Sequence, residues 1–284
     1  MKRSVIPYLL ASSVLVLSGC GPSAPAGSLP PSATAPGVSA SPEVSPEPQT
    51  EAQRQIAAFA ADPDAWQLPD DRGWRGYAVT DLDQDGNWEL ITALDEGTGH
   101  FTTTAIFEAD PLHPPFTRVG LGRSLTAEDA LEALSHGGPI AAGPLLLPHW
   151  ELDDGPQQYP VYRDRDNGAY YYIYEDTISN AGSRYGTFST LLAFSLNQDG
   201  AEGILLGCEK ATYGDAVTRD RWDLYGNCID QTTYEELART HFEGLEELEA
   251  GILWVSPAHG EVLDEAAWYQ LLTTSMEGFS LTEA

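Results

Sequence analysis

Apolar and polar residues follow three different patterns along the chain. Residues 4–18 carry no charge and are mostly apolar, whereas residues 21–50 show no regular apolar spacing. From residue 51 onward, apolar positions recur with the spacing of either helices or strands, whose periods are 3.6 and 2 residues. The pattern therefore predicts a short apolar segment, an irregular segment and a folded region over 51–284.

Helical spacing occurs near both ends of the folded region. Thr50 and Gln53 have the spacing of a capping box and start the first expected helix. The longest apolar stripe starts near Thr232 and extends to Leu248, which predicts one long helix. A last helix is expected after Asp264, which is a good N-cap residue.

Strand signals lie between these helices. Alternating apolar positions rich in aromatic and β-branched residues predict strands over 77–82, 89–94, 102–107, 159–162, 170–174, 190–196 and 203–206. Asp166, Asn167 and Gly168 supply residues that tolerate positive φ, so a tight hairpin is expected there. Because hairpins pair antiparallel and no Pro-rich linker divides 51–284, we predict a single α+β domain with antiparallel hairpins and helices near both ends.

The amino terminus has the parts of a secretory signal. Lys2 and Arg3 precede the uncharged run, which is about 15 residues long and is interrupted by Pro7. A helix that crosses a membrane needs roughly 20 apolar residues. The run is therefore predicted to be a cleaved signal peptide and not a permanent membrane span.

The signal ends in Leu17-Ser18-Gly19-Cys20, which resembles the bacterial lipobox. This resemblance implies that residues 1–19 are removed and that Cys20 carries a diacylglyceryl group as the first mature residue. The lipid would anchor the chain to the extracytoplasmic face of the cell membrane. The alternative is an ordinary signal peptide with a coincidental cysteine.

Residues 20–50 are predicted to be a disordered tether. After Cys20, the segment contains eight prolines and neither aromatic nor basic residues. Such a composition buries too little apolar surface to offset the entropy of ordering. The tether spans between about 30 Å as a flexible coil and about 90 Å as extended polyproline, so it holds the domain clear of the lipid headgroups.

The charge of the chain excludes one class of partner. Loss of Lys2 and Arg3 with the signal leaves 12 basic and 43 acidic residues, a formal charge of −31. Nucleic-acid binding depends on clustered Lys and Arg, so no nucleic acid is expected as a partner. Anionic headgroups would also repel this surface, which leaves the lipid as the membrane contact. Cation binding and solubility in a salty medium both remain compatible with the acidity.

One acidic segment has the spacing of a metal-binding loop. Asp81, Asp83, Asp85 and Glu89 occupy positions 1, 3, 5 and 9, and Gly86 at position 6 permits a sharp turn. Calcium accepts six to eight oxygen ligands in flexible geometry, so one calcium site is predicted here. The alternative is an acidic hairpin turn that binds nothing.

The loop differs from an EF-hand because position 12 is Thr92 and not Glu, and because strands are expected on both sides. It resembles the calcium loops of FG-GAP and VCBS repeats, in which a strand enters and another leaves. By this resemblance the four acids are side-chain ligands and Asn87 contributes its backbone carbonyl. The segment 196–200 repeats 82–86 at an offset of 114 residues but lacks the first and last acids, which predicts a hairpin turn or a decayed repeat.

Two cysteines remain after lipidation. Cys208 and Cys228 lie in a compartment that favours oxidation, so their even number predicts a disulfide. Two free thiols are the alternative.

Catalytic motifs are absent from the sequence, and the six histidines show no ligand-like spacing. The tyrosines of 170–174 are expected to pack within a strand, with a sugar-binding platform as the alternative. As a whole, the chain resembles bacterial lipoproteins that join a lipobox, a Pro-rich tether and one Asp-rich loop, a resemblance that implies no activity. We therefore expect a calcium-stabilised binding or interaction module whose ligand the sequence does not identify, with a surface protein and a carbohydrate as the candidates. The alternative is a secreted hydrolase that uses carboxylates, possible in principle for any pair of well-placed acids.

Overall fold

The computed structural model describes the folded region with several gaps. The described residues are 49–68, 74–96, 101–109, 116–123, 125, 128–130, 132, 155–179, 186–197, 200–258 and 261–284. Pro48–Ala284 form one compact unit. The predicted signal peptide and Cys20 lie outside the described residues, as does the tether apart from its last two residues. Within the described part of the chain, no helix is long and apolar enough to cross a membrane.

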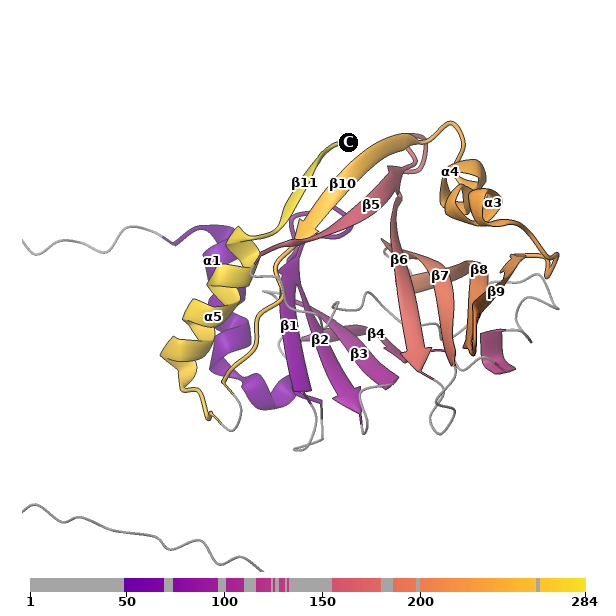
Figure 1. Cartoon of the computed structure of the whole chain (residues 1–284). Coiled ribbons are helices and arrows are strands. Elements are labelled where there is room, and N and C mark those ends of the chain that lie inside the picture. Colours follow the sequence, from indigo (N-terminus) through magenta and orange to yellow (C-terminus); the bar gives the residue numbers. More distant parts are fainter. Residues whose placement is uncertain are drawn as a thin grey trace, which may run out of the picture. The chain divides into compact units, whose positions relative to one another are not determined.

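Two antiparallel sheets form the framework of the domain (Figure 1). The first has four strands in the order β1-β2-β3-β4, with bounds Trp74–Thr80, Glu89–Glu96, Phe101–Glu108 and Thr117–Arg123. The second has seven strands in the order β11-β10-β5-β6-β7-β8-β9. In chain order its strands are β5 (Gln157–Arg163), β6 (Tyr170–Ser179), β7 (Gly186–Asn197), β8 (Gly200–Tyr213), β9 (Val217–Asp223), β10 (Glu246–Ile252) and β11 (Ser280–Glu283).

Helices accompany the sheets at both ends of the domain, which confirms the predicted α+β class. They are α1 (Glu51–Ala61), the short 3-10 turn η1 (Pro63–Ala65), α3 (Gln231–Glu235), α4 (Leu237–His241) and α5 (Glu265–Glu277). The predicted capping box of α1 is present, because Thr50 and Gln53 each bond the other's backbone N–H. Asp264 caps α5 by accepting a hydrogen bond from Ala267 N at 2.9 Å.

Apolar contacts join these elements in layers. Helices α1 and α5 cover one face of the four-stranded sheet, where Phe59 and Trp268 pack with Tyr77 and Leu90. The opposite face of that sheet packs against the seven-stranded sheet in a cluster that includes Ala78, Ile91, Tyr172 and Phe194. Residues of the α3–α4 region cover the far face of the seven-stranded sheet. Both sheets thus have apolar contacts on both faces, and Figure 1 shows α1 and α5 to one side of the four-stranded sheet.

The long helix predicted from Thr232 to Leu248 is wrong. Asp230, not Thr232, caps the first turn, and the chain forms only the short α3 and α4. Gly244, with φ of 90°, then turns the backbone into β10. Leu248 belongs to this strand and pairs with Val161 of β5. The apolar stripe is therefore divided: Tyr234 is buried from α3, whereas Leu248 is buried from a strand.

The predicted hairpins are present, although some strands lacked a signal. The turn at 164–169 joins β5 to β6, and Gly168 alone of its residues has positive φ, at 77°. Asn197 pairs with Gly200 across a two-residue turn, which confirms the hairpin predicted at 196–200. Strands β4, β9, β10 and β11 were not predicted. All seven residues of β9 are at least partly exposed, so it has no apolar alternation to reveal it.

The structure does not contain the predicted disulfide between Cys208 and Cys228, and both are free cysteines. Trp222 lies between them: it pairs with Cys208 on one side and with Cys228 on the other. Paired Cα atoms of antiparallel strands are about 4.5–5.5 Å apart, so two such steps separate the cysteines by about 10 Å. A disulfide requires Cα atoms within about 7 Å. Cys208 is buried, whereas Cys228 is exposed.

Candidate metal centre

The four predicted acidic ligands meet in one place. Asp81 follows the last residue of β1 and Glu89 is the first residue of β2, so the loop between them closes a hairpin. One carboxylate oxygen from each of Asp81, Asp83, Asp85 and Glu89 lies within 4.8 Å of the others. A loop that curls around a central point needs some residues with positive φ. Gln84 and Gly86 have φ of 59° and 89°. The loop therefore can hold a metal ion.

Glu89 closes the inner side of the group. Its side chain is 1% exposed, and its Oε2 atom accepts hydrogen bonds from Leu82 N at 2.8 Å and Thr80 Oγ1 at 3.3 Å. Its Oε1 atom accepts none from the described residues. Burial, reinforced by the neighbouring Asp83 and Asp81, raises the pKa of Glu89 well above its ordinary value. Burial of a carboxylate is costly unless hydrogen bonds or a positive charge compensate it.

The three aspartates are held by backbone donors of the loop. Asp83 Oδ1 accepts from Asp85 N at 3.3 Å, and Asp81 Oδ1 accepts from Gly86 N at 3.4 Å. Burial and the adjacent Asp85 raise the pKa of Asp83 to about 6, while burial raises the pKa of Asp81. Each of these raised pKa values means that the surroundings disfavour the ionised carboxylate. A bound cation would favour the ionised form instead.

Asn87 takes part through its donors. Its backbone N–H donates to Asp85 Oδ1 at 2.7 Å and its side-chain amide donates to Asp85 Oδ2 at 2.9 Å. These bonds fix the orientation of the most exposed acid in the loop. The role of the Asn87 carbonyl as a ligand stays a prediction.

Two residues far away in the sequence support the loop and were missed by sequence reasoning. Gln55 of α1, which is 2% exposed, donates to Gly86 O at 3.2 Å and accepts from Trp88 N at 2.7 Å. Tyr172 of β6 donates from its hydroxyl to Leu82 O at 2.8 Å. The position of Gln55 on the apolar face of its helix could have indicated a buried polar contact. Nothing in the sequence near Tyr172 indicated its contact with the loop.

A third missed residue is a fifth acid near the group. Glu108, the last residue of β3, pairs with Glu89 across the sheet. Its charge contributes to the raised pKa of Asp83, which places it close to the loop. Because Glu108 lies 19 positions beyond Glu89 in sequence, only the β2–β3 register brings the two together.

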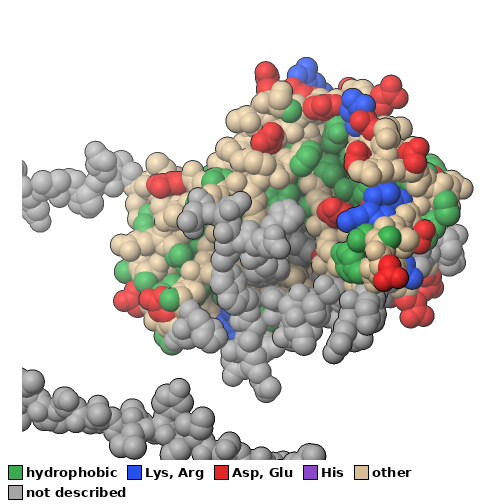
Figure 2. Space-filling view, in the orientation of Figure 1, with side chains coloured by type: hydrophobic (Ala, Val, Ile, Leu, Met, Phe, Trp, Pro, Cys, Tyr) green, Lys and Arg blue, Asp and Glu red, His purple; other side chains and the backbone are tan. Residues whose placement is uncertain are grey.

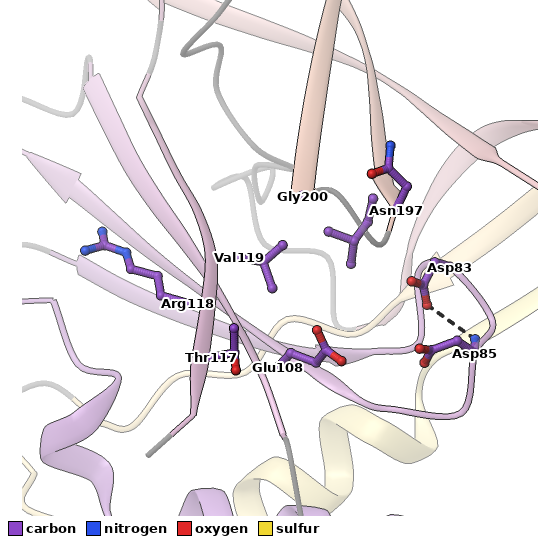
Figure 3. A pocket seen from close by; sticks show the side chains of 9 residues that line it. Asp83, Asp85, Glu108, Thr117, Arg118, Val119, Asn197 and Gly200 are labelled. Atoms are coloured by element: carbon purple, nitrogen blue, oxygen red, sulfur yellow. Dashed lines mark hydrogen bonds between the residues drawn. The ribbon is translucent and has the colours of Figure 1, made fainter. Parts of the chain in front are cut away.

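A pocket of about 330 Å³ adjoins the acidic loop of residues 81–89, called the metal loop below (Figure 3). Asp83 and Asp85 form one side, β3 and β4 contribute a second side, and the β7–β8 turn contributes the third. The described lining residues are Asp83, Asp85, Glu108, Thr117, Arg118, Val119, Leu196, Asn197 and Gly200. The two segments that repeat each other in sequence therefore border the same pocket.

The tyrosines of β6 do not form a surface platform. Tyr170, Tyr172 and Tyr174 are buried in the cluster between the two sheets, as predicted for strand packing. Tyr171 points to the other face and stacks on Phe242, with ring centroids 4.8 Å apart.

The surface in Figure 2 shows acidic side chains at several places, with few basic ones among them.

Comparison with known proteins gives no relative: no protein family, curated protein or solved structure matches this chain.

Proposed function

We propose that this chain is a calcium-stabilised binding module, held at the extracytoplasmic face of a membrane by a lipid on Cys20. The observation that carries the proposal is the buried Glu89 carboxylate, whose oxygen lies within 4.8 Å of three aspartate oxygens. Four carboxylates so close repel one another unless a cation intervenes. Binding therefore couples to the stability of the hairpin and of everything packed on it.

Calcium fits the donor set better than other biological cations. All four side chains offer oxygen, whereas zinc and copper sites usually contain His or Cys. Calcium–oxygen distances of about 2.3–2.6 Å allow ligands on opposite sides to be about 4.6–5.2 Å apart, which accommodates the observed 4.8 Å. Magnesium, at about 2.0–2.1 Å, demands a tighter octahedron.

A binding role is favoured over hydrolysis by the arrangement around the pocket. Glycoside hydrolysis needs two carboxyl groups that flank the bond to be cleaved. Of the three acids among the described lining residues, Asp83 and Asp85 are assigned to the cation. Glu108 is the third acid of that described lining, whereas glycoside hydrolysis needs a pair of carboxyl groups that are not committed to a cation.

The calcium site is tested by melting temperature and by terbium luminescence. Trp88 lies in the loop, so excitation of its indole should sensitise terbium bound there. At about 2 mM calcium and a dissociation constant of about 0.1 mM, binding adds roughly 1.8 kcal/mol to the free energy of unfolding. Asp83→Asn should abolish both effects.

The matched control is Asp166→Asn, which removes an acid from an exposed hairpin turn in the other sheet. It should leave calcium stabilisation and terbium emission unchanged. If calcium moved neither the melting temperature nor the emission of the unmodified chain, the loop would be only an acidic turn.

The anchor rests on the lipobox and is tested separately. Mass spectrometry of the mature amino-terminal peptide should find a diacylglyceryl group on Cys20, and Cys20→Ala should release the protein from the membrane fraction. An unmodified Cys20 in exported protein would contradict the anchor and leave the calcium proposal untouched.

A further inference from the structure

We propose that the pocket beside the metal loop binds a neutral, polyhydroxylated ligand, a carbohydrate, whose hydroxyl oxygens complete the coordination of the calcium ion. The inference rests on the proposed calcium site and adds the chemical class of its ligand. The pocket, of about 330 Å³, lies near the lower end of the range of about 300–1,000 Å³ for small-molecule sites. It would therefore take one or two sugar units and not a long chain.

The side of the cation that is not covered by the protein would face this pocket. Asp83 and Asp85 belong both to the metal group and to the pocket lining. Glu89 closes the opposite, inner side, where it is tied to Leu82 N. Calcium takes six to eight oxygens, and the loop supplies four side chains and one predicted carbonyl. The remaining positions open towards the pocket, where water or ligand oxygens would bind.

The charges around the pocket select a neutral ligand. Three carboxylates line it, and in Figure 3 Arg118 extends away from its centre. A bound calcium ion would offset two of the five negative charges carried by its four ligands and Glu108, and the remaining negative charge would repel an anion. A cationic group would meet the calcium ion itself. Hydroxyl groups avoid both penalties and are oxygen ligands that calcium accepts.

The rest of the lining suits a sugar ring. Glu108 and Asn197 place polar side chains on two sides of the pocket, and Figure 3 shows Glu108 directed towards the space between β4 and the loop. Val119 and Leu196 supply apolar surface for the C–H groups of a ring. Polar groups that converge on a small, partly apolar cavity are typical of small-molecule sites.

The frame of the pocket is fixed by contacts between the sheets. A Cβ atom built on Gly200 would lie 3.8 Å from Val119 O, so the start of β8 lies against β4. Gly200 has φ of 127°, which residues with a side chain rarely adopt. The third wall is thus held in place by a backbone conformation and a contact that do not depend on the metal.

The test is binding of the full chain to an array of immobilised mono- and oligosaccharides, in calcium and in chelator, followed by titration with the free methyl glycoside of the sugar bound best. We expect binding in calcium only. Asn197→Ala, which changes no charge, and Glu108→Gln should each weaken binding at least tenfold while retaining terbium emission from the loop. Glu249→Gln, an exposed acid on β10, is the matched control and should bind as the unmodified chain does.

The outcomes separate this inference from the calcium site. Terbium emission without calcium-dependent binding to any sugar would overturn the ligand class and keep the metal. Binding that persists in chelator, or that both pocket variants retain, would also overturn it. Loss of the terbium signal in the unmodified chain would refute the calcium site first, and the inference with it.

Discussion

The side-chain amide of Gln55 holds the backbone of Trp88, 33 residues away, by a hydrogen bond of 2.7 Å from Trp88 N to Gln55 Oε1. The same amide donates to Gly86 O at 3.2 Å. Helix α1 thereby fixes the loop on both sides of Asn87, between the third and fourth acids of the metal group. A residue in the second turn of α1 thus positions a candidate cation site in a distant hairpin.

Replacement of Gln55 by Leu should loosen the loop and weaken calcium binding. The change removes two part-buried hydrogen bonds, to Gly86 O and from Trp88 N, and such bonds typically contribute about 0.5–1.5 kcal/mol each. Urea unfolding with and without calcium measures both effects. Gln53→Leu, on the same helix, removes only the capping-box contact with Thr50 and should lower stability without reducing the calcium-dependent difference. Equal calcium dependence in the two variants would argue against the positioning role.

Replacement of Glu89 by Gln should stabilise the chelated protein and abolish its response to calcium. Gln retains an oxygen that accepts from Leu82 N but has no charge to bury, and burial is the main cause of the raised pKa of Glu89. The roughly 1.8 kcal/mol expected from calcium should disappear with the ligand. Thermal unfolding in chelator and in calcium gives both values. A variant less stable than the unmodified chain in chelator would contradict the assignment of Glu89 as a ligand.

The stability of the chelated protein should fall as pH rises from about 4 to about 6. Asp83 has a pKa of about 6 in the folded chain, against an ordinary value of 3.8, because of burial and the nearby Asp85. The folded state therefore binds more protons than the unfolded state within this window, and the free energy of unfolding decreases as the pH rises. Calcium competes with these protons, so its stabilising effect should be largest above pH 6 and fade towards pH 4.

The measurement is the melting temperature against pH, in chelator and in calcium, for the unmodified chain and for Asp83→Asn. Carboxylates with lowered pKa, such as Glu246 beside Arg165, contribute the opposite trend in both proteins. The difference between the two curves isolates Asp83. Parallel curves across pH 4–6 would contradict the prediction.

The two domain cysteines should differ in reactivity and should not be joined. Burial raises the pKa of Cys208 to about 12, whereas Cys228 is exposed. The thiolate is the reactive form, so iodoacetamide should modify Cys228 in the folded protein and Cys208 only after unfolding. Peptide mapping by mass spectrometry distinguishes the two. A Cys208–Cys228 cross-link in non-reduced, exported protein would contradict the strand order around Trp222.

Local features were predictable because their determinants lie within a few residues. The capping box at Thr50, the N-cap at Asp264 and the hairpin at 196–200 each depend on short-range hydrogen bonds or backbone angles. The spacing of Asp81, Asp83, Asp85 and Glu89 belongs to the same class, since one hairpin loop brings them together. Segments whose apolar residues fit two periods were not predictable in this way. The stripe ending at Leu248 fitted a helix, and its pairing with β5 made part of it a strand.

By itself, the sequence determined the acidic loop and the α+β class, because turn chemistry and hydrophobic periodicity act over a few neighbouring residues. Only the tertiary structure decided what surrounds the loop. Gln55 reaches it across 31 residues, Tyr172 across 90, and the β7–β8 turn faces it across the pocket. It also decided that Cys208 and Cys228 stay apart, since one intervening strand separates them by about twice the spacing of paired strands. These contacts follow from strand order and register, which depend on the packing of the whole core. The local sequence around each residue therefore does not predict them.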